Sequence, residues 1–169
     1  MINNVVCTAD LNCAIDLRQL ANTTYNVIYD PKRYTGVRWS HPKIGGHCTV
    51  FSSGKLIVNG RATWISEAKV RLRRYARYIQ RLGWAVVLSD VKVVTISASF
   101  KTEGTLNLPN VVRYYGGQYE PEIFPAAMFA KDSIHFTCFH TGSVLMTGIK
   151  SNQQLFDTCI PILIELPLL

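Results

Sequence analysis

The chain has 169 residues, of which 48% are apolar and 11% aromatic, so it is long enough to bury a sizeable core and is not expected to be disordered. No apolar run reaches the roughly 18 residues of a membrane span, and no signal peptide follows Met1, so we expect a soluble protein that is not secreted and binds no membrane. The net charge of +7 predicts an anionic partner.

The positive charge is concentrated in the first half of the chain. Residues 1–90 carry 13 Lys/Arg against 5 Asp/Glu, whereas residues 91–169 carry 5 against 6. The five cysteines form no Cys-x-x-Cys pair, and their odd number favours reduced, buried thiols in a reducing compartment over a disulfide framework.

Short β-branched and aromatic runs in the first sixty residues predict strands joined by glycine-containing turns. The strand candidates are residues 4–9, 25–29, 34–40, 47–52 and 56–59. Residues 16–21 predict a short helix between the first two strands. Ser53-Gly54 is typical of a tight hairpin turn, and Thr141-Gly142 has the same pattern later in the chain.

From Thr63 the apolar residues recur every three or four positions, which predicts a long helix with one apolar face and a C-terminal stop at Gly83. The apolar face consists of Ile65, Ala68, Leu72, Tyr75, Ala76, Ile79 and Leu82. Lysine and arginine occupy most of the remaining positions. The helix should therefore pack by its apolar stripe and expose a basic surface.

The chain contains an internal repeat. Tyr-Asp-Pro-Lys-Arg-Tyr (29–34) is answered ninety residues later by Tyr-Glu-Pro-Glu-Ile-Phe (119–124), and residues 51–60 are answered by residues 139–148 at an offset of eighty-eight. We expect one domain made of two repeats, about 1–88 and 89–169. The second repeat should also end in a helix, with Ser151 and Gln154 as a capping box and with Pro161 kinking or ending it.

The repeat predicts an α+β fold in which the strands merge into one antiparallel sheet and both long helices lie on one face. The other face of the sheet would then be bare and partly apolar. An exposed apolar face needs a partner that covers it, so we expect the function to lie there.

Four motifs resemble the TATA-binding-protein family over residues 4 to about 163. They are residues 29–34, Phe-Ser-Ser-Gly-Lys (51–55), Arg-Arg-Tyr-Ala-Arg-Tyr-Ile-Gln-Arg-Leu-Gly (73–83) and Tyr-Glu-Pro-Glu-Ile-Phe-Pro (119–125). The resemblance implies a pseudo-twofold saddle with a curved ten-stranded antiparallel sheet and two long helices on the convex face. In the TATA-binding protein itself the concave face binds the minor groove of DNA, and apolar side chains wedge between base steps and kink the duplex.

By this resemblance the wedge positions are Tyr34 and Phe51 in the first repeat and Phe124 and Phe139 in the second. Without the resemblance, four core aromatic rings would be the simpler interpretation. The remaining positions expected to contact the groove floor or phosphates are Asn4, Val6, Arg33, Thr49, Lys55, Ile57, Asn59, Thr95, Ser97, Thr137, Leu145 and Thr147.

Several positions depart from the family pattern. Thr95 and Ser97 stand where the family has Asn and Val, and Asn59 stands where Thr is usual. Thr49 and Thr137 replace large aliphatic residues, and the family's phosphate-binding arginines align with Ser40 and Ala130. We expect weaker phosphate binding, offset by Arg33, Arg38, Lys43 and Lys55. These departures resemble a TBP-like or TBP-related factor paralogue and leave a strict TATA preference in doubt.

The resemblance also implies protein partners. Lys69, Arg74, Arg77 and Arg81 match the basic helix that binds transcription factor IIA (TFIIA) and negative regulators, although a solvated helix face is the alternative. Glu120 and Glu122 match the acidic pair that binds transcription factor IIB (TFIIB), with ordinary turn carboxylates as the alternative. TBP-associated factors, a homodimer in the absence of DNA, and a nuclear location are further expectations of this resemblance.

We find no pattern typical of catalysis, a metal site or a cofactor. His47 and His135 occupy equivalent repeat positions and should face the underside of the sheet. A metal site shared with Cys48 and Cys138 is disfavoured, because neighbouring strand residues point to opposite faces. The alternatives to a DNA-bending initiation factor are a scaffold that binds TFIIA and TFIIB but grips DNA poorly, and a nucleic-acid module of another system.

Overall fold

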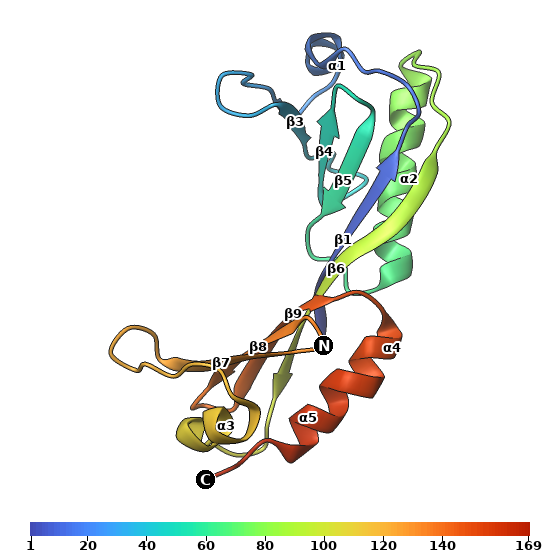
Figure 1. Ribbon diagram of the computed structural model, residues 1–169. Coiled ribbons are helices and arrows are strands. Elements are labelled where there is room, and N and C mark those ends of the chain that lie inside the picture. The colour runs from blue at the N-terminus through green and yellow to red at the C-terminus, as the bar shows by residue number, and fades with distance from the viewer. The chain divides into compact units, whose positions relative to one another are not determined.

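The computed structural model describes all 169 residues, which form two compact units. The first unit is Asn4–Val94, and the second unit is Thr95–Leu169 together with Met1–Asn3. The boundary falls inside the strands β1 (Ile2–Asp10) and β6 (Ser89–Lys101), which contribute residues to both units. Figure 1 follows the chain through its elements.

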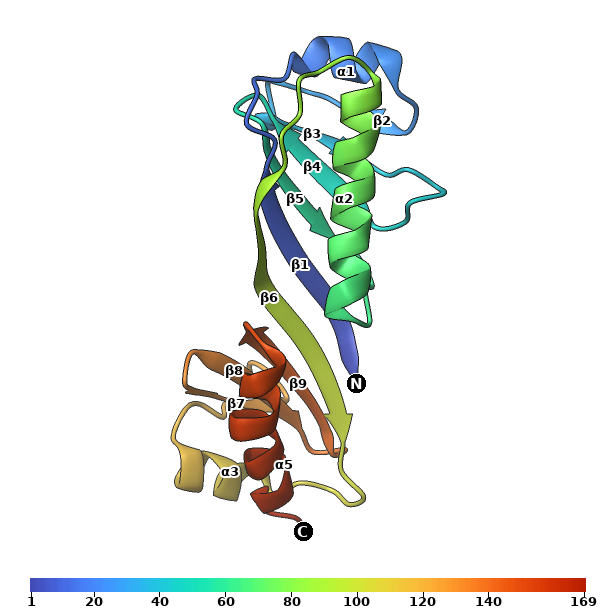
Figure 2. The same ribbon diagram turned by 90° about the vertical axis from the view of Figure 1, so that its right-hand side faces the viewer.

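The first unit is an antiparallel sheet with helices on one side. Its strand order is β2-β3-β4-β5-β1. The strands are β1, β2 (Val27–Ile28), β3 (Gly36–Trp39), β4 (His47–Phe51) and β5 (Lys55–Asn59), and the helices are α1 (Leu17–Thr23) and α2 (Ile65–Arg81). All five strand candidates and both helices predicted for this half are present with shifted ends, and Figure 2 shows α2 in front of the strands.

Helix α2 buries the stripe that its periodicity predicts. Ala68, Leu72, Tyr75, Ala76 and Ile79 are buried, and they cover the buried side chains of the strands beneath them. The helix ends at Arg81 with Leu82 as its C-cap, and Gly83 follows at φ +112°, a backbone conformation that glycine adopts without strain.

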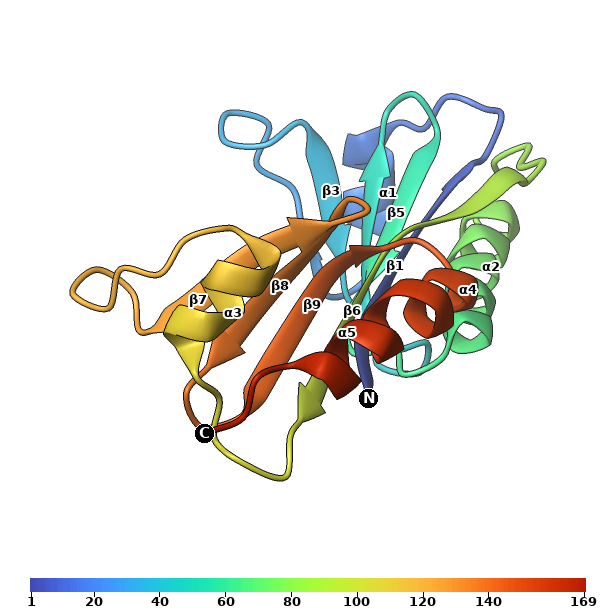
Figure 3. The same ribbon diagram turned by 60° about the horizontal axis from the view of Figure 1, so that its bottom comes forward.

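The second unit repeats this arrangement with the strand order β6-β9-β8-β7. Its strands β7, β8 and β9 are Ala126–Lys131, Ile134–Phe139 and Ser143–Ile149, and its first helix α3 is Leu108–Tyr115. The long C-terminal helix consists of α4 (Asn152–Gln154), the π-helical turn η1 (Leu155–Cys159) and α5 (Ile160–Glu165). Figure 3 shows α4 and α5 together with α3 against these strands.

Pro161 does not end the C-terminal helix. A proline inside a helix lacks the N–H that would bond to the carbonyl four residues earlier. The five residues Leu155–Cys159 adopt the wider π-helical pattern just before it, and the helix then continues to Glu165. The Oγ of Ser151 accepts from the backbone N–H of Gln154 at 3.2 Å, as the predicted cap requires.

The structure has nine strands, one fewer than the ten that the resemblance implies. The counterpart of β2 in the second unit is reduced to a single bridge between Gln118 and Met128. Gly117 precedes this bridge at φ +100°, and a Cβ there would lie 2.0 Å from the carbonyl oxygen of Met128. The backbones approach so closely that a regular strand gives way to a glycine turn.

This close approach makes Gly117 a sensitive position. Gly117→Ala should lower the free energy of unfolding by about 3 kcal/mol or more, because both the backbone conformation and the clash with Met128 oppose a side chain. Gly83→Ala is the matched control, since Gly83 has a similar φ but no atom within 4 Å of an added Cβ, and it should cost about 1 kcal/mol. Urea denaturation followed by fluorescence measures both, and equal losses would contradict the steric explanation.

Candidate nucleic-acid interface

Strand alternation gives the first unit one covered and one uncovered sheet face. On β1, β4 and β5 every second side chain is buried, and the side chains between them remain partly exposed. We call the side without helices the open face. Its residues include Asn4 and Val6 on β1, Thr49 and Phe51 on β4, and Lys55, Ile57 and Asn59 on β5. The predicted groove residues of this half therefore share one surface.

The second unit has an equivalent open face. Thr137 pairs with Leu145 and His135 pairs with Thr147, so these four side chains lie on the same side of β8 and β9. Thr95 and Ser97 alternate with the buried Ile96 and Ala98 on β6, although the register with β9 shifts between Ile96 and Ala98.

An aromatic pair flanks the open face in each unit. The ring centroids of Tyr34 and Phe51 are 6.1 Å apart with an angle of 58° between the rings, and those of Phe124 and Phe139 are 6.0 Å apart with an angle of 68°. Tyr34 and Phe124 each keep 39% of their surface exposed, and Phe51 and Phe139 are partly exposed. None of the four rings lies in the hydrophobic core.

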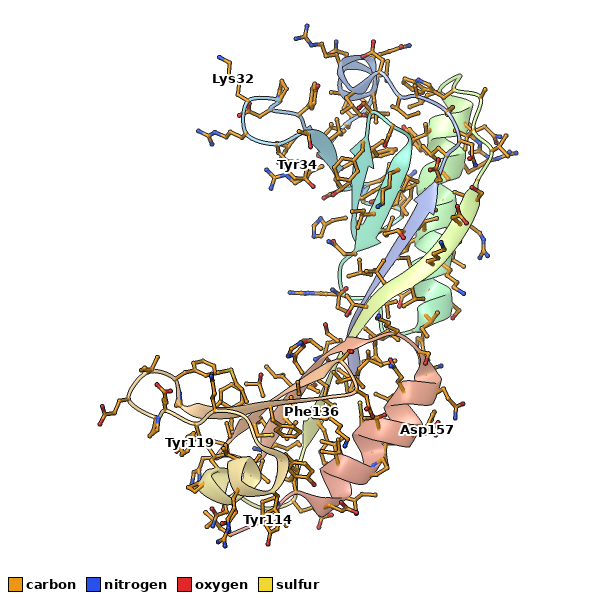
Figure 4. All side chains as sticks on the ribbon, in the orientation of Figure 1. Lys32, Tyr34, Tyr114, Tyr119, Phe136 and Asp157 are labelled. Carbon is orange, nitrogen blue, oxygen red and sulfur yellow. The ribbon has the colours of Figure 1, made fainter.

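The loop before each pair has the same hydrogen bonds in both units. The backbone N–H of Tyr34 donates to the carbonyl of Asp30, and that of Phe124 donates to Glu120, both at 2.9 Å. Figure 4 shows Lys32 at the tip of the first loop, with Tyr34 where the loop returns to the sheet. The turn therefore fixes where the first ring of each pair stands.

Two polar side chains at equivalent repeat positions are tied to the backbone. The Oδ1 of Asn4 accepts from the N–H of Gly60 at 3.0 Å, and the Oγ1 of Thr95 accepts from the N–H of Gly148 at 3.2 Å. Each bond orients its side chain and leaves the amide N–H₂ of Asn4 and the hydroxyl proton of Thr95 as donors. The minor groove of A·T pairs presents only acceptors, so such donors suit it.

The cations expected to bind phosphate do not all lie on this side. Arg38 pairs with Thr49, and its guanidinium carbon is 5.6 Å from the centroid of the Tyr34 ring, so it lies on the open face. The side chain of Arg33 is 87% exposed at the loop and lies 3.5 Å from a carboxylate oxygen of Asp30. Lys43 lies in the β3–β4 loop beside α2, on the side of the sheet opposite the open face, so its predicted contact with phosphate stays a prediction.

The open face includes two residues that the sequence motifs do not single out. Met128 pairs with Thr137, and Ser99 pairs with Leu145, so both lie among the predicted groove residues. The alternation of side chains between the two sheet faces along β6 and β7 could have predicted both positions from the sequence. Met128 occupies the repeat position of Arg38, so the first unit has a cation where the second has an apolar side chain.

The residues predicted to bind protein partners lie away from the open face. Arg74, Arg77 and Arg81 are exposed on α2, and Lys69 is partly exposed there. Glu120 and Glu122 are exposed in the loop before β7. The arrangement gives the first unit a basic helix and the second an acidic loop.

Comparison with known proteins identifies the family. The model of the family described as "Transcription factor TFIID (or TATA-binding protein, TBP)" matches residues 1–82 and 90–166. The chain belongs to the TATA-binding protein family. This is a family of transcription factors and not of enzymes.

Relatives in the TATA-binding protein family include fungal and animal proteins. The chain is 32% identical over 160 residues to the TATA-box-binding protein of Strongylocentrotus purpuratus, covering 92% of this chain and 60% of the relative. It is also 32% identical over 173 residues to that of Saccharomyces cerevisiae, covering 97% of this chain and 71% of the relative. Among the curated relatives that it matches, the chain spans between about half and three quarters of the relative's length.

A solved structure confirms the predicted α+β fold of the TATA-binding protein family. Methanococcus jannaschii TBP superimposes with a TM-score of 0.84 at 26% identity, over 96% of this chain and 94% of that chain. No helix of the chain is long and apolar enough to cross a membrane.

The cysteines of this TATA-binding protein family member lie mostly on the covered side. Burial raises the pKa of Cys138 to about 12 and that of Cys159 to about 11, and it raises the pKa of Cys48 further. Cys7 is buried as well, whereas Cys13 is partly exposed. The thiolate is the reactive form, so the four buried thiols should be inert near neutral pH.

We therefore expect a single fast thiol in the folded protein. Burial and the Asp10 carboxylate raise the pKa of Cys13 too, but only Cys13 is accessible, so dithionitrobenzoate at pH 8 should react with Cys13 before the four buried thiols. Cys13→Ser should remove this first phase, while denaturant should expose all five cysteines. Absorbance of the released thiolate measures the reaction. Rapid reaction of several thiols in the folded protein would show that the reagent reaches the buried side chains of the covered face.

Proposed function

We propose that this chain is a general transcription initiation factor that binds double-stranded promoter DNA through the minor groove and bends it. The observation that carries the proposal is the pair of partly exposed aromatic rings flanking an uncovered sheet face in each unit. Tyr34 and Phe51 would wedge at one base step, and Phe124 and Phe139 at another. Flat apolar rings are suited to this because they replace the base stacking that the kink removes.

The open face has the mixed character that a minor groove needs. Its side chains include donors such as Asn4 and Thr95 and apolar groups such as Val6, Ile57 and Leu145, in contrast to the many cations of a surface that binds phosphate alone. Arg33, Arg38 and Lys55 supply positive charge at the first unit, and Lys101, which pairs with Ser143, supplies it at the second.

The asymmetry supports a paralogue with relaxed sequence preference. The first unit keeps Asn4 and Val6, whereas Thr95 and Ser97 take their places in the second, and Ser40 and Ala130 supply no phosphate-binding guanidinium. Fewer phosphate contacts should lower affinity and its dependence on salt. The second candidate function is a scaffold that binds TFIIA and TFIIB but has weak or non-TATA DNA binding, and the same substitutions favour it.

The proposed protein partners are TFIIA at α2 and TFIIB at the acidic loop of the second unit. Lys69, Arg74, Arg77 and Arg81 offer an exposed positive surface to an acidic partner, and Glu120 and Glu122 offer the opposite charge. TBP-associated factors or negative regulators would use the same helix, and a second copy of the chain would cover the open face when DNA is absent. A nuclear location follows from this role.

Substitution of the wedge rings tests the function. Phe124→Ala and Phe139→Ala should each raise the dissociation constant for a TATA duplex about tenfold or more, since a base stacked on an aromatic ring is worth about 1–3 kcal/mol. Both should also reduce the bend angle, because they remove the groups that hold the base step open. Mobility-shift and circular-permutation assays on TATA and non-TATA duplexes measure both quantities.

Phe156→Ala is the matched control, because Phe156 is a 62% exposed phenylalanine on the helical side of the same unit and should leave binding unchanged. If all three variants bind the duplex with the affinity and bend angle of the wild type, the wedge mechanism is ruled out. Binding that requires TFIIA would favour the scaffold instead.

A further inference from the structure

A basic pocket lies on the helical side of the first unit. It has a volume of about 300 Å³ and lies between α2 and the loop that joins β3 to β4. Arg74, Arg77 and Arg81 line it from the helix, and Lys43 lines it from the loop, with His41 and Tyr78 as further walls. We call this the β3–β4 pocket.

The four cations of the pocket have no carboxylate partner. The ion pairs of the chain are Arg33–Asp30, Arg71–Glu67 and Lys92–Asp90, none of which includes a pocket residue. No aspartate or glutamate lines the pocket. Positive charges that converge without a counter-ion repel one another, so an anion that enters lowers the electrostatic energy.

The loop wall of the pocket is fixed before any ligand arrives. The buried Tyr75 hydroxyl accepts from the backbone N–H of His41 at 3.0 Å and donates to the carbonyl of Gly45 at 3.2 Å. The N–H groups of Ile44 and Gly45 donate to the carbonyl of His41, and the His41 ring packs 5.1 Å from that of Tyr78. Lys43 is thus held opposite the helix, which reduces the entropy lost on binding.

We propose that the β3–β4 pocket binds a compact polyphosphate anion. A guanidinium presents paired N–H donors that match two oxygens of a phosphoryl group, and three arginines with one lysine provide more donors than one carboxylate can accept. A short polyphosphate carries several charges and many acceptor oxygens within a volume of this size. The pocket therefore suits a phosphate chain better than an isolated acidic side chain.

The pocket is separate from the proposed DNA site. Helix α2 and the loop lie on the covered side of the sheet, whereas the aromatic pair and the groove residues of this unit lie on the open face. DNA bound to the open face leaves the pocket free. An acidic protein on α2 would meet the same arginines, so a polyphosphate would compete with it.

Calorimetric titration with inorganic tripolyphosphate tests the proposal on the intact chain without DNA. The wild type should bind one anion, and Arg74→Gln with Arg77→Gln should lower the affinity about a hundredfold, or about tenfold for each guanidinium removed. Lys69→Gln with Arg73→Gln is the matched control, because it removes the same charge from the same helix outside the pocket. It should lower the affinity less than about threefold.

Three results would overturn the proposal: no binding heat, an equal loss in both double variants, or displacement of the anion by a duplex. Equal losses would mean that net charge alone attracts tripolyphosphate. Displacement would place the pocket within the DNA surface. Circular dichroism confirms that the exposed substitutions leave the fold intact. The titrations of the wild type and the variants contain no DNA, and the duplex is added only in a separate displacement titration, so a failure to bind tripolyphosphate is independent of the wedge assay.

Discussion

The rest of the structure depends on one constraint: side chains alternate along each strand, and helices cover only one side of the sheet. Val50 and Leu56 are buried on the covered side of the sheet, so their neighbours Thr49 and Ile57 must point the other way. The second unit obeys the same rule through Thr137 and Leu145. Each unit therefore presents a partly apolar surface that no helix covers, and this surface needs a partner.

The two repeats keep their internal bonds while their surfaces diverge. The N–H of Gly60 donates a hydrogen bond to Asn4 in the first unit, and the N–H of Gly148 donates the equivalent bond to Thr95 in the second. Both loops also have the same turn before the first aromatic ring. The outer surfaces differ: the arginines of α2 contrast with the exposed Phe156, Ile160 and Ile164 of the C-terminal helix. Two similar folds thus present a basic helical surface in one unit and an apolar one in the other.

Periodicity and turn residues in the sequence were sufficient to predict α2 and the strands of the first unit, whereas the predicted groove residues came from the family resemblance, which did not single out Met128 and Ser99. The absence of a tenth strand was not predictable, because it depends on how closely Gly117 approaches Met128. The π-helical turn before Pro161, after which the helix continues, was likewise not predictable from the local sequence. The loop wall of the basic pocket depends on the hydrogen bond between the backbone of His41 and the Tyr75 hydroxyl. These residues are 34 positions apart, so no local sequence pattern predicts the bond.

The most direct test of the central claim asks whether bound DNA is unstacked where the aromatic pairs meet it. 2-Aminopurine, whose fluorescence rises when it leaves the base stack, can be placed at successive steps of a bound duplex. The account predicts brightening at two separate steps, one for Tyr34 with Phe51 and one for Phe124 with Phe139, and loss of the second with Phe139→Ala. Tight binding with uniform quenching at every step would contradict it.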